Sequence, residues 1–169
     1  MANPTAAICV IGDEILSGRT KDKNIGWLAE QLNGIGIKLT EARIIEDVKD
    51  TIIRHISDLS AANDYVFTSG GIGPTHDDIT TESVAAAFGV KIERNEEAMR
   101  RLEKHYMGTE IVLNEVRKKM ADIPLGATLI DNPVSAAPGF CLNNVYVMAG
   151  VPSIMQSMFE GLAPKLKGG

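Results

Sequence analysis

A glycine-rich run with two adjacent carboxylates lies in the middle of the chain. Residues 68–80 read TSGGIGPTHDDIT, directly after a short apolar stretch that predicts a buried strand at residues 65–68. Gly70, Gly71 and Gly73 have no Cβ, so a ligand can approach the backbone, and main-chain N–H groups can point at its anionic oxygens. A helix predicted over residues 80–88 would add its positive end. These features are typical of a phosphate site.

Two acids, Asp77 and Asp78, indicate that phosphate is not the whole ligand. Carboxylates repel phosphate unless they hold a divalent cation or bind the hydroxyl and amino groups of the ligand. The run also lacks the lysine of a P-loop, and His76 stands where a dinucleotide motif has its third glycine. The alternative interpretation is a structural turn whose glycines relieve strain and whose aspartate caps a helix.

A second acid-bearing glycine loop follows the apolar stretch at residues 6–11. It reads GDEILSG over residues 12–18 and precedes a helix that we expect to begin at about Ile25, with Asn24 as its N-cap. A strand predicted over residues 37–45 ends just before Asp47. Asp13, Asp47 and Asp78 therefore each follow a strand. One such acid could be a helix cap or a solvated charge, but three together favour a functional site.

Strands and helices alternate through the first half of the chain, with a further helix expected over residues 51–59. This alternation predicts a mostly parallel sheet covered by helices on both faces, with ligands held outside the carboxyl ends of the strands. Residues 88–132 depart from the alternation, with helices expected over residues 95–106 and near residues 112–121. We expect this insertion beside the pocket, where it could cover the ligand or form a subunit contact.

The composition is that of one globular, water-soluble domain. The chain has 169 residues, of which 44% are hydrophobic and 23% charged, and this length can bury a substantial core. A net charge of −5 argues against nucleic acid as a partner. No apolar stretch reaches membrane-spanning length and no signal region opens the chain, so we expect a cytoplasmic protein in which Cys9 and Cys141 pack in the core.

The only basic run comprises Arg117, Lys118 and Lys119 in one of the predicted helices. Such a run is commonly a solvated face. The functional alternative is that Arg117 or Lys118 reaches a phosphate of the ligand.

Five motifs in order give the chain a family resemblance. It resembles the molybdopterin-binding domain of molybdenum cofactor biosynthesis proteins, and most closely the version at the amino terminus of the competence/damage-inducible protein CinA and its stand-alone relatives. The resemblance implies a three-layer α/β/α sandwich with a mostly parallel sheet, forming a single domain over residues 1–169 that is shorter at its carboxyl end than many relatives. The motifs are GDEILSG with Asn24, the turn at Asp47, SGGIGPTHDDIT at 69–80, NPVSAAPGF at 132–140 and GVPS at 150–153.

The resemblance also assigns roles to residues. Asp47 and Asp78 match the pair associated with catalysis, and we expect them to hold a metal ion as well. Ser69 and the backbone that follows it would cradle phosphate. Ala149 replaces a proline of the family pattern, so the GVPS loop is expected to be looser. The expected ligand-binding residues are Gly12, Asp13, Glu14, Ser69, Gly70, Gly71, Gly73, Pro74, Thr75, Asp77, Gly150, Pro152 and Ser153.

Three functions follow from the resemblance and remain open. The first is binding of a phosphate-bearing pterin, molybdopterin or its adenylylated form, with Mg²⁺ or another divalent cation, in molybdenum cofactor biosynthesis. As an enzyme, the domain would then resemble molybdopterin adenylyl- or molybdotransferases. The second is a metal-dependent nucleotide pyrophosphatase of the CinA type that acts on ligands such as ADP-ribose. The third is a non-catalytic binding module. Relatives form oligomers, so we also expect a homodimer or homotrimer.

Overall fold

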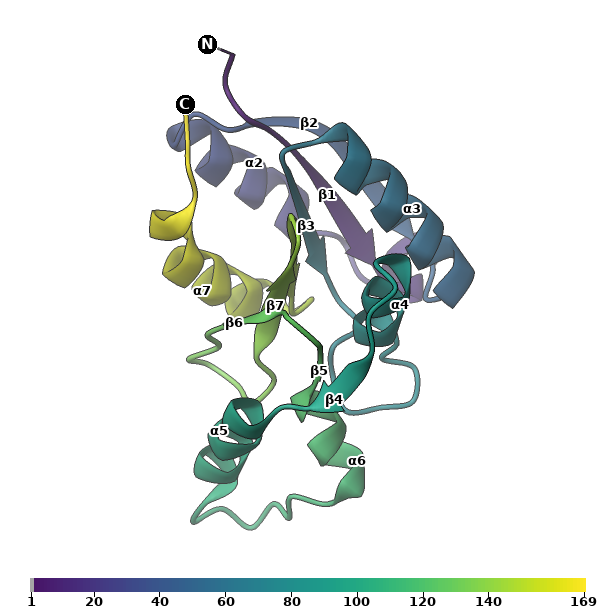
Figure 1. Cartoon of the computed structure of the whole chain (residues 1–169), viewed down its shortest axis with the longest axis vertical. Coiled ribbons are helices and arrows are strands. Elements are labelled where there is room, and N and C mark those ends of the chain that lie inside the picture. Colours follow the sequence, from purple (N-terminus) through teal and green to yellow (C-terminus); the bar gives the residue numbers. More distant parts are fainter. Residues whose placement is uncertain (1) are drawn as a thin grey trace.

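The computed structural model describes residues 2–169 and contains a central six-stranded sheet (Figure 1). Strand β7 runs antiparallel to both of its neighbours, and the other strands are parallel to one another, which confirms the predicted mostly parallel sheet. The strand order is β2 (Lys38–Ile45), β1 (Thr5–Ile11), β3 (Tyr65–Ser69), β8 (Val145–Met148), β7 (Gly139–Leu142) and β6 (Thr128–Ile130).

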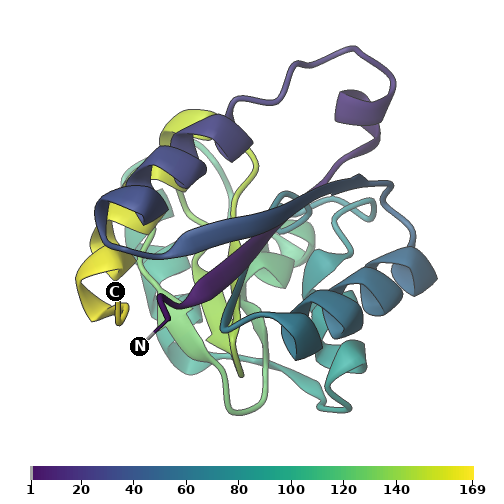
Figure 2. The ribbon, with the colours of Figure 1, turned by 90° about the horizontal axis from the view of Figure 1, so that it is seen from above.

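Helices cover both faces of this sheet (Figure 2). Helices α2 (Asn24–Gly34) and α7 (Pro152–Leu162) pack against each other on one face, and α3 (Lys49–Ala62) and α4 (Thr80–Ala87) do so on the other. The three-layer α/β/α arrangement is thereby confirmed. Strand β1 is almost fully buried because both of its faces are covered, which explains its unbroken apolar sequence. No helix formed by residues 2–169 has both the length and the apolar character needed to cross a membrane.

The insertion forms a lobe below the sheet in the view of Figure 1. It contains β4 (Ile92–Arg94) paired with β5 (Asp122–Pro124), α5 (Glu96–Tyr106), α6 (Glu115–Lys118) and the 3₁₀ turn η1 (Lys119–Ala121). Helix α5 begins as predicted, because the Asn95 side chain accepts a hydrogen bond of 2.9 Å from the Ala98 N–H. The helix expected near residues 112–121 is shorter than predicted, since it tightens into the 3₁₀ turn after one turn.

Two short helices complete the element order. Helix α1 (Asp13–Leu16) follows β1 in the first acid-bearing loop, and the 3₁₀ turn η2 (Ala163–Lys165) follows α7. The prediction that Asn24 caps the next helix is wrong, because α2 begins at Asn24 itself. The Asp22 carboxylate accepts hydrogen bonds from the N–H groups of Asn24 and Ile25, at 3.1 and 3.0 Å. The Asn24 side chain is consequently available for a contact elsewhere.

Aromatic side chains join the sheet to the layer formed by α2 and α7. Phe67 on β3 stacks on Tyr146 of β8 with a centroid distance of 5.3 Å, and it meets the edge of Phe159 on α7 at 5.8 Å. Trp27 on α2 meets the same Phe159 at 5.7 Å, so it packs helix against helix.

Cys9 on β1 is fully buried, and burial raises the pKa of its thiol to about 12. A thiol in that state is an inert core residue, as predicted.

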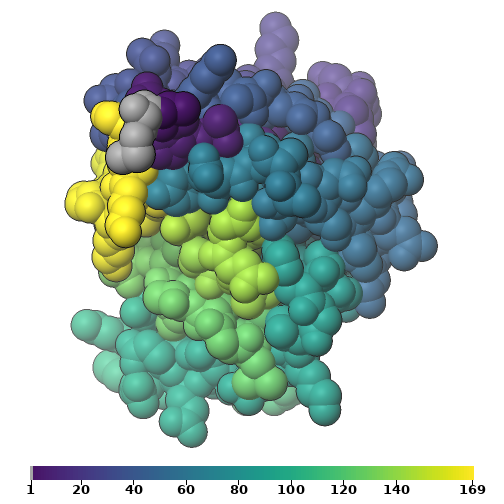
Figure 3. All heavy atoms as spheres, turned by 45° about the horizontal axis from the view of Figure 1, so that its top comes forward, coloured from purple at the N-terminus to yellow at the C-terminus, as the bar shows by residue number. Residues whose placement is uncertain are grey.

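The carboxyl-terminal segment lies beside the amino-terminal strand (Figure 3). The Tyr65 hydroxyl donates a hydrogen bond to the Lys167 carbonyl and accepts one from the Lys167 N–H, at 3.1 and 3.0 Å. The Gly169 N–H donates to the Ile35 carbonyl at 3.2 Å. These contacts lie at the amino ends of the parallel strands. The opposite edge, where the carboxyl ends meet, is free to form a site.

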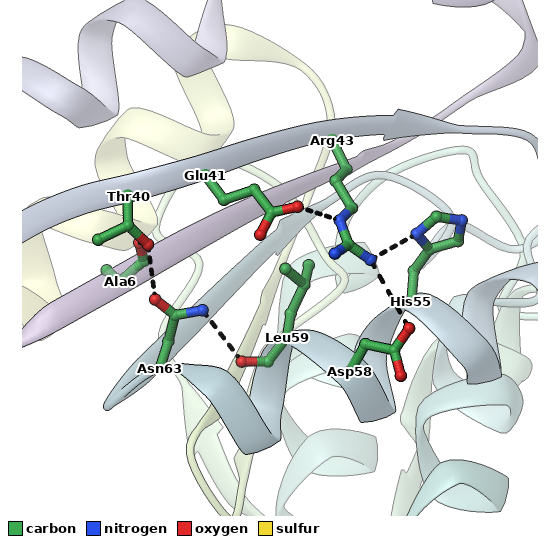
Figure 4. A network of polar contacts seen from close by, with 8 residues as sticks. All are labelled: Ala6, Thr40, Glu41, Arg43, His55, Asp58, Leu59 and Asn63. Carbon is green, nitrogen blue, oxygen red and sulfur yellow. Dashed lines mark hydrogen bonds and ion pairs between the residues drawn. The ribbon is translucent and has the colours of Figure 1, made fainter.

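Polar contacts attach the edge strand β2 to helix α3 (Figure 4). The Arg43 guanidinium pairs with Glu41 on its own strand, and across to α3 its Nη1 lies 2.9 Å from His55 Nδ1 and 4.0 Å from Asp58 Oδ2. Nδ1 can accept the Arg43 hydrogen bond only while it carries no proton. Burial lowers the pKa of His55, and the charges of Arg43 and Arg54 lower it further. Folding therefore favours the neutral form of the His55 side chain.

We expect this contact to make stability depend on pH. Because the pKa of His55 is lower in the folded protein than its usual 6.5, the stabilisation is complete above pH 6.5. It is lost as pH falls through 6.5 towards the folded-state pKa, since the unfolded chain then binds the extra proton. Thermal unfolding of wild type and His55→Gln between about pH 8 and about pH 5.5 should show a steeper loss in wild type. Parallel curves for the two proteins would contradict this.

Candidate functional site

A cleft of about 760 Å³ lies between the carboxyl edge of the sheet and the lobe. Strand ends supply one wall through Ile11, Gly70 and Gly150. The end of α5 supplies the opposite wall through His105 and Tyr106. A cleft of this volume accommodates a ligand the size of a cofactor.

The glycine turn after β3 lines the floor of the cleft. Gly70 and Gly71 have φ values of 104° and 77°, in the left-handed region that favours glycine. A Cβ on Gly70 would collide with the Ile11 carbonyl, and one on Gly71 would collide with the Thr80 side chain. The N–H groups of residues 71–73 make no hydrogen bonds within residues 2–169, so they are available to an anion.

Residues 69–80 form the signature loop, and this loop fixes the position of its own second acid, Asp78. Its carboxylate accepts hydrogen bonds from the N–H and hydroxyl of Thr75, at 2.9 and 2.8 Å. The neighbouring His76 points away, with 93% of its side chain exposed. This arrangement places Asp78, but not His76, on the wall of the cleft.

Lys119 ties the signature loop to the lobe. Its Nζ donates hydrogen bonds to the carbonyls of Thr75, at 2.6 Å, and Asp78. The other two cations of the basic run lie elsewhere: Arg117 donates to the Val112 carbonyl, and Lys118 pairs with an acid one turn earlier. Neither Arg117 nor Lys118 lines the cleft, so the expectation that one of them reaches a ligand phosphate stays an untested prediction that the geometry does not favour. Lys119, which we did not single out from the sequence, is the one that contacts the loop.

Asp13 and Asp47 hold the two other loops together reciprocally. The Asp13 N–H donates to Asp47 Oδ2 at 3.1 Å, and the Asp47 N–H donates to Asp13 Oδ1 at 3.0 Å. Partial burial raises the pKa of Asp47, and the carboxylates of Asp13, Glu14 and Asp78 raise it further, against the lowering effect of the Asp13 N–H. These carboxylates come from loops that are distant in sequence, and their charges all act on Asp47. Asp13 itself does not line the cleft.

Asp47 and Asp78 both line the cleft, and two carboxylates suit a cation that takes its remaining ligands from elsewhere. Across residues 2–169 no group of three His, Cys, Asp or Glu side chains could hold a metal ion alone. Mg²⁺ usually keeps several waters and binds through one or two carboxylates plus substrate phosphates. Asp47 and Asp78 fit that pattern, with the ligand supplying oxygens.

A second hollow of about 530 Å³ continues the cleft along α5. Its lining includes Arg101, Lys104 and Asn132, while His105 and Ser135 line both hollows. Arg101 is paired with acids, but Lys104 forms no ion pair among residues 2–169. The combined groove therefore has the acids Asp47, Asp77 and Asp78 at one end, whereas the other end holds Lys104 beside the ion pair of Arg101 and Asp131.

The predicted ligand-binding residues divide into two groups. The cleft is lined by Glu14, Asp47, Gly70, Gly71, Gly73, Pro74, Asp77, Asp78, Gly150 and Pro152. It is not lined by Gly12, Asp13, Ser69, Thr75 and Ser153. Asp13 and Thr75 bind the side chains of Asp47 and Asp78, which places them behind the wall of the cleft. Ser153 is exposed in the first turn of α7.

The lobe and the motif at residues 132–140 contribute lining residues that the sequence did not identify individually. His105, Tyr106 and Ile111 reach the cleft from the end of α5 and the segment after it, and Ser135 and Ala136 reach it from the NPVSAAPGF motif. The motif was a usable signal for the last two. No local pattern marks the first three, because their position depends on how the lobe packs on the sheet.

Replacement of Lys119 by methionine should loosen the signature loop. It removes a cation that bonds two loop carbonyls, so we expect the free energy of unfolding to fall by about 1–3 kcal/mol. Amide exchange over residues 72–79 should also accelerate. The matched control is Lys118→Met, whose loss of an exposed ion pair should cost less than about 1 kcal/mol. Equal effects of both substitutions would contradict the role given to Lys119.

Comparisons with known proteins agree with this geometry. The family model described as "Probable molybdopterin binding domain" matches residues 7–168. A relative from Pyrobaculum calidifontis is 37% identical over 97% of this chain and 64% of its own length. A CinA-like protein from Sulfurihydrogenibium sp. is also 37% identical, over 91% of this chain and 40% of its own length. The chain thus spans less than two thirds of either relative.

Solved structures show the same fold. The protein CinA from Thermoplasma acidophilum superposes with a TM-score of 0.88 at 31% identity, covering 95% of this chain and 98% of that one. The molybdopterin biosynthesis enzyme MoaB from Thermus thermophilus gives a TM-score of 0.61 at 14% identity over 96% and 91% of the two chains, a likeness of fold alone. The chain is similar to CinA-type proteins, and it belongs to the molybdopterin-binding domain family.

Proposed function

We propose that the cleft binds a phosphate-bearing pterin, molybdopterin or its adenylylated form, together with Mg²⁺. The observation that carries this proposal is the convergence of the unbonded amides of residues 71–73 with Asp47 and Asp78 on one cleft. Amides bind phosphate oxygens, and the carboxylates hold the cation that offsets their charge. Family membership supports a pterin as the organic part of the ligand.

The charges along the groove suggest how the ligand lies. Its phosphate would rest on the glycine turn, next to Asp78, which Thr75 holds in place. A second anionic group, such as the one that adenylylation adds, would extend towards Lys104 and His105, in a hollow whose lining acid, Asp131, is paired with Arg101. When bound, Mg²⁺ would neutralise charge on the phosphoryl oxygens. The residues that line the cleft would orient the ligand, and the walls of the cleft would partly exclude water.

A nucleotide pyrophosphatase of the CinA type is the second candidate. The observation in its favour is the continuity of the two hollows, because a ligand with a central diphosphate would span them with one end in each. A binding module without turnover would have the same geometry, so a turnover assay must separate the three functions.

We expect Asp78→Asn to abolish Mg²⁺-dependent ligand binding. The panel would comprise molybdopterin, its adenylylated form, ADP-ribose and FAD, each with Mg²⁺, measured by thermal shift and by product release. Stabilisation of wild type by a pterin without turnover supports binding, whereas ADP-ribose hydrolysis that Asp78→Asn removes supports the pyrophosphatase. The control is Glu30→Gln, an exposed acid on α2, which should behave as wild type. Unchanged binding by Asp78→Asn would contradict the proposal.

Asp47→Asn should stabilise the free protein while weakening cation binding. The raised pKa of Asp47 means that its ionised form is disfavoured in the folded state above that pKa. This penalty shrinks as pH falls and vanishes below the unfolded value of 3.8. Asparagine removes the charge and can still accept the Asp13 N–H, so the Tm should rise by about 1–3 °C at neutral pH.

The advantage of Asp47→Asn should fade near the unfolded pKa of 3.8, where wild type no longer carries the charge. Wild type, but not the variant, should gain Tm when Mg²⁺ and a binding ligand are added together. A lower Tm for the variant at neutral pH would contradict the assignment of Asp47 as a strained functional acid.

The homo-oligomer remains a prediction. The segment between α5 and α6 exposes apolar side chains, with Met107 and Val112 at 77% and 69% exposure. Such a surface is compatible with a subunit contact. Gel filtration with light scattering should give the mass of a dimer or trimer, and a monomeric mass at micromolar concentration would contradict the prediction.

A further inference from the structure

A small chamber opens from the cleft between β1, β3 and the start of α2. Its volume is about 50 Å³, enough for one water molecule or one small polar group. Ile11, Glu14, Thr20 and Gly150 line both the chamber and the cleft, so the two spaces adjoin. The inner end of the chamber is formed by side chains that the larger cleft does not touch.

Two buried polar atoms at the chamber have no hydrogen-bond partner. Ser69 is 1% exposed and Asn24 is 4% exposed, and neither Ser69 Oγ nor Asn24 Oδ1 is bonded within residues 2–169. The Asn24 amide is oriented by its own Nδ2, which donates to the Gly150 carbonyl at 2.9 Å. Its Oδ1 is thereby fixed as an acceptor. Buried polar atoms are normally paired, so two unpaired ones at one chamber indicate an absent partner.

The hydrogen-bonding chemistry of Asn24 Oδ1 and Ser69 Oγ limits which ligand group can pair with them. An amide oxygen accepts hydrogen bonds only, whereas a serine hydroxyl both donates and accepts. A phosphate oxygen without a proton would be repelled by Asn24 Oδ1. The charges that line the chamber are balanced, with Lys21 and Lys23 opposite Glu14 and Asp22, so they give no preference for an anion. These atoms therefore favour a partner that is not an anion and that carries at least one donor.

We infer that this chamber receives a neutral group of the ligand that donates and accepts hydrogen bonds, such as a sugar hydroxyl or a ring amide, while the phosphate stays on the glycine turn. The inference rests on the proposed function, because it assumes a phosphate ligand in the cleft. It differs from the sequence-based expectation that Ser69 contacts the phosphate itself. Asn24 becomes a specificity residue, and its bond to Gly150 couples the chamber to the loop that leads into α7.

Two adjacent residues of β3 provide a matched pair for the test. Thr68 is also fully buried and its Oγ1 is also unpaired, but it lines neither the chamber nor the cleft. Ser69→Ala and Thr68→Val each remove one unpaired buried hydroxyl. Both variants should fold, because an apolar replacement of an unsatisfied group is close to neutral for stability.

The experiment is calorimetric titration of wild type and both variants with three probes in Mg²⁺: ADP-ribose, a pterin phosphate and inorganic pyrophosphate. We expect Ser69→Ala to weaken whichever organic probe binds wild type by about tenfold. Pyrophosphate, which has no neutral group, should bind Ser69→Ala and wild type alike. Thr68→Val should bind all three probes as wild type does.

Several results would overturn the inference, each in a distinct way. Equal weakening of pyrophosphate and organic probes by Ser69→Ala would show that Ser69 contacts phosphate. Unchanged binding of every probe, together with a lower Tm of the free Ser69→Ala protein, would show that the chamber holds a structural water. Wild type that binds none of the probes would instead overturn the proposed function, and the inference with it.

Discussion

The close approach of the glycine turn to the end of β1 is the constraint on which the site depends. Gly70 lies against the Ile11 carbonyl and Gly71 lies against Thr80, so neither position has room for a side chain. This packing brings the loops after two adjacent parallel strands to one edge of the sheet and leaves backbone N–H groups unbonded there. Glu14 of the first loop and Asp77 and Asp78 of the second then face a cleft whose floor is main chain.

The site concentrates negative charge that the free protein does not neutralise. Partial burial raises the pKa of Asp47, and three nearby carboxylates raise it further. The cations nearest to the signature loop are committed to structure, because Lys119 bonds loop carbonyls rather than carboxylates. A binding site that carries such strain gains stability when a cation and an anionic ligand arrive together. The fold therefore holds the acids in place through hydrogen bonds from Asp13 and Thr75, not through ion pairs.

The sequence predicted the features that depend on local pattern and topology. The alternation of strands and helices implied the layered sheet, and acids after successive strands implied that Asp47 and Asp78 would lie at one edge of it, where both line the cleft. It could not predict contacts made across long sequence separations. Lys119 lies more than forty residues after the loop that it holds, and Asn24 contacts Gly150 from the opposite end of the chain. The insertion was expected beside the pocket and does lie there, but the α5 residues that line the cleft could not be identified, since helical periodicity does not specify how a lobe packs.

The central claim is that backbone amides and carboxylates of one cleft share a single ligand. A crystal structure of the protein with Mg²⁺ and a binding phosphate ligand tests this most directly. We predict a phosphate group within hydrogen-bond distance of the N–H groups of residues 71–73 and a cation bound by Asp47 and Asp78. A phosphate bound elsewhere, with this glycine turn bare and the two acids hydrated without a cation, would contradict the claim.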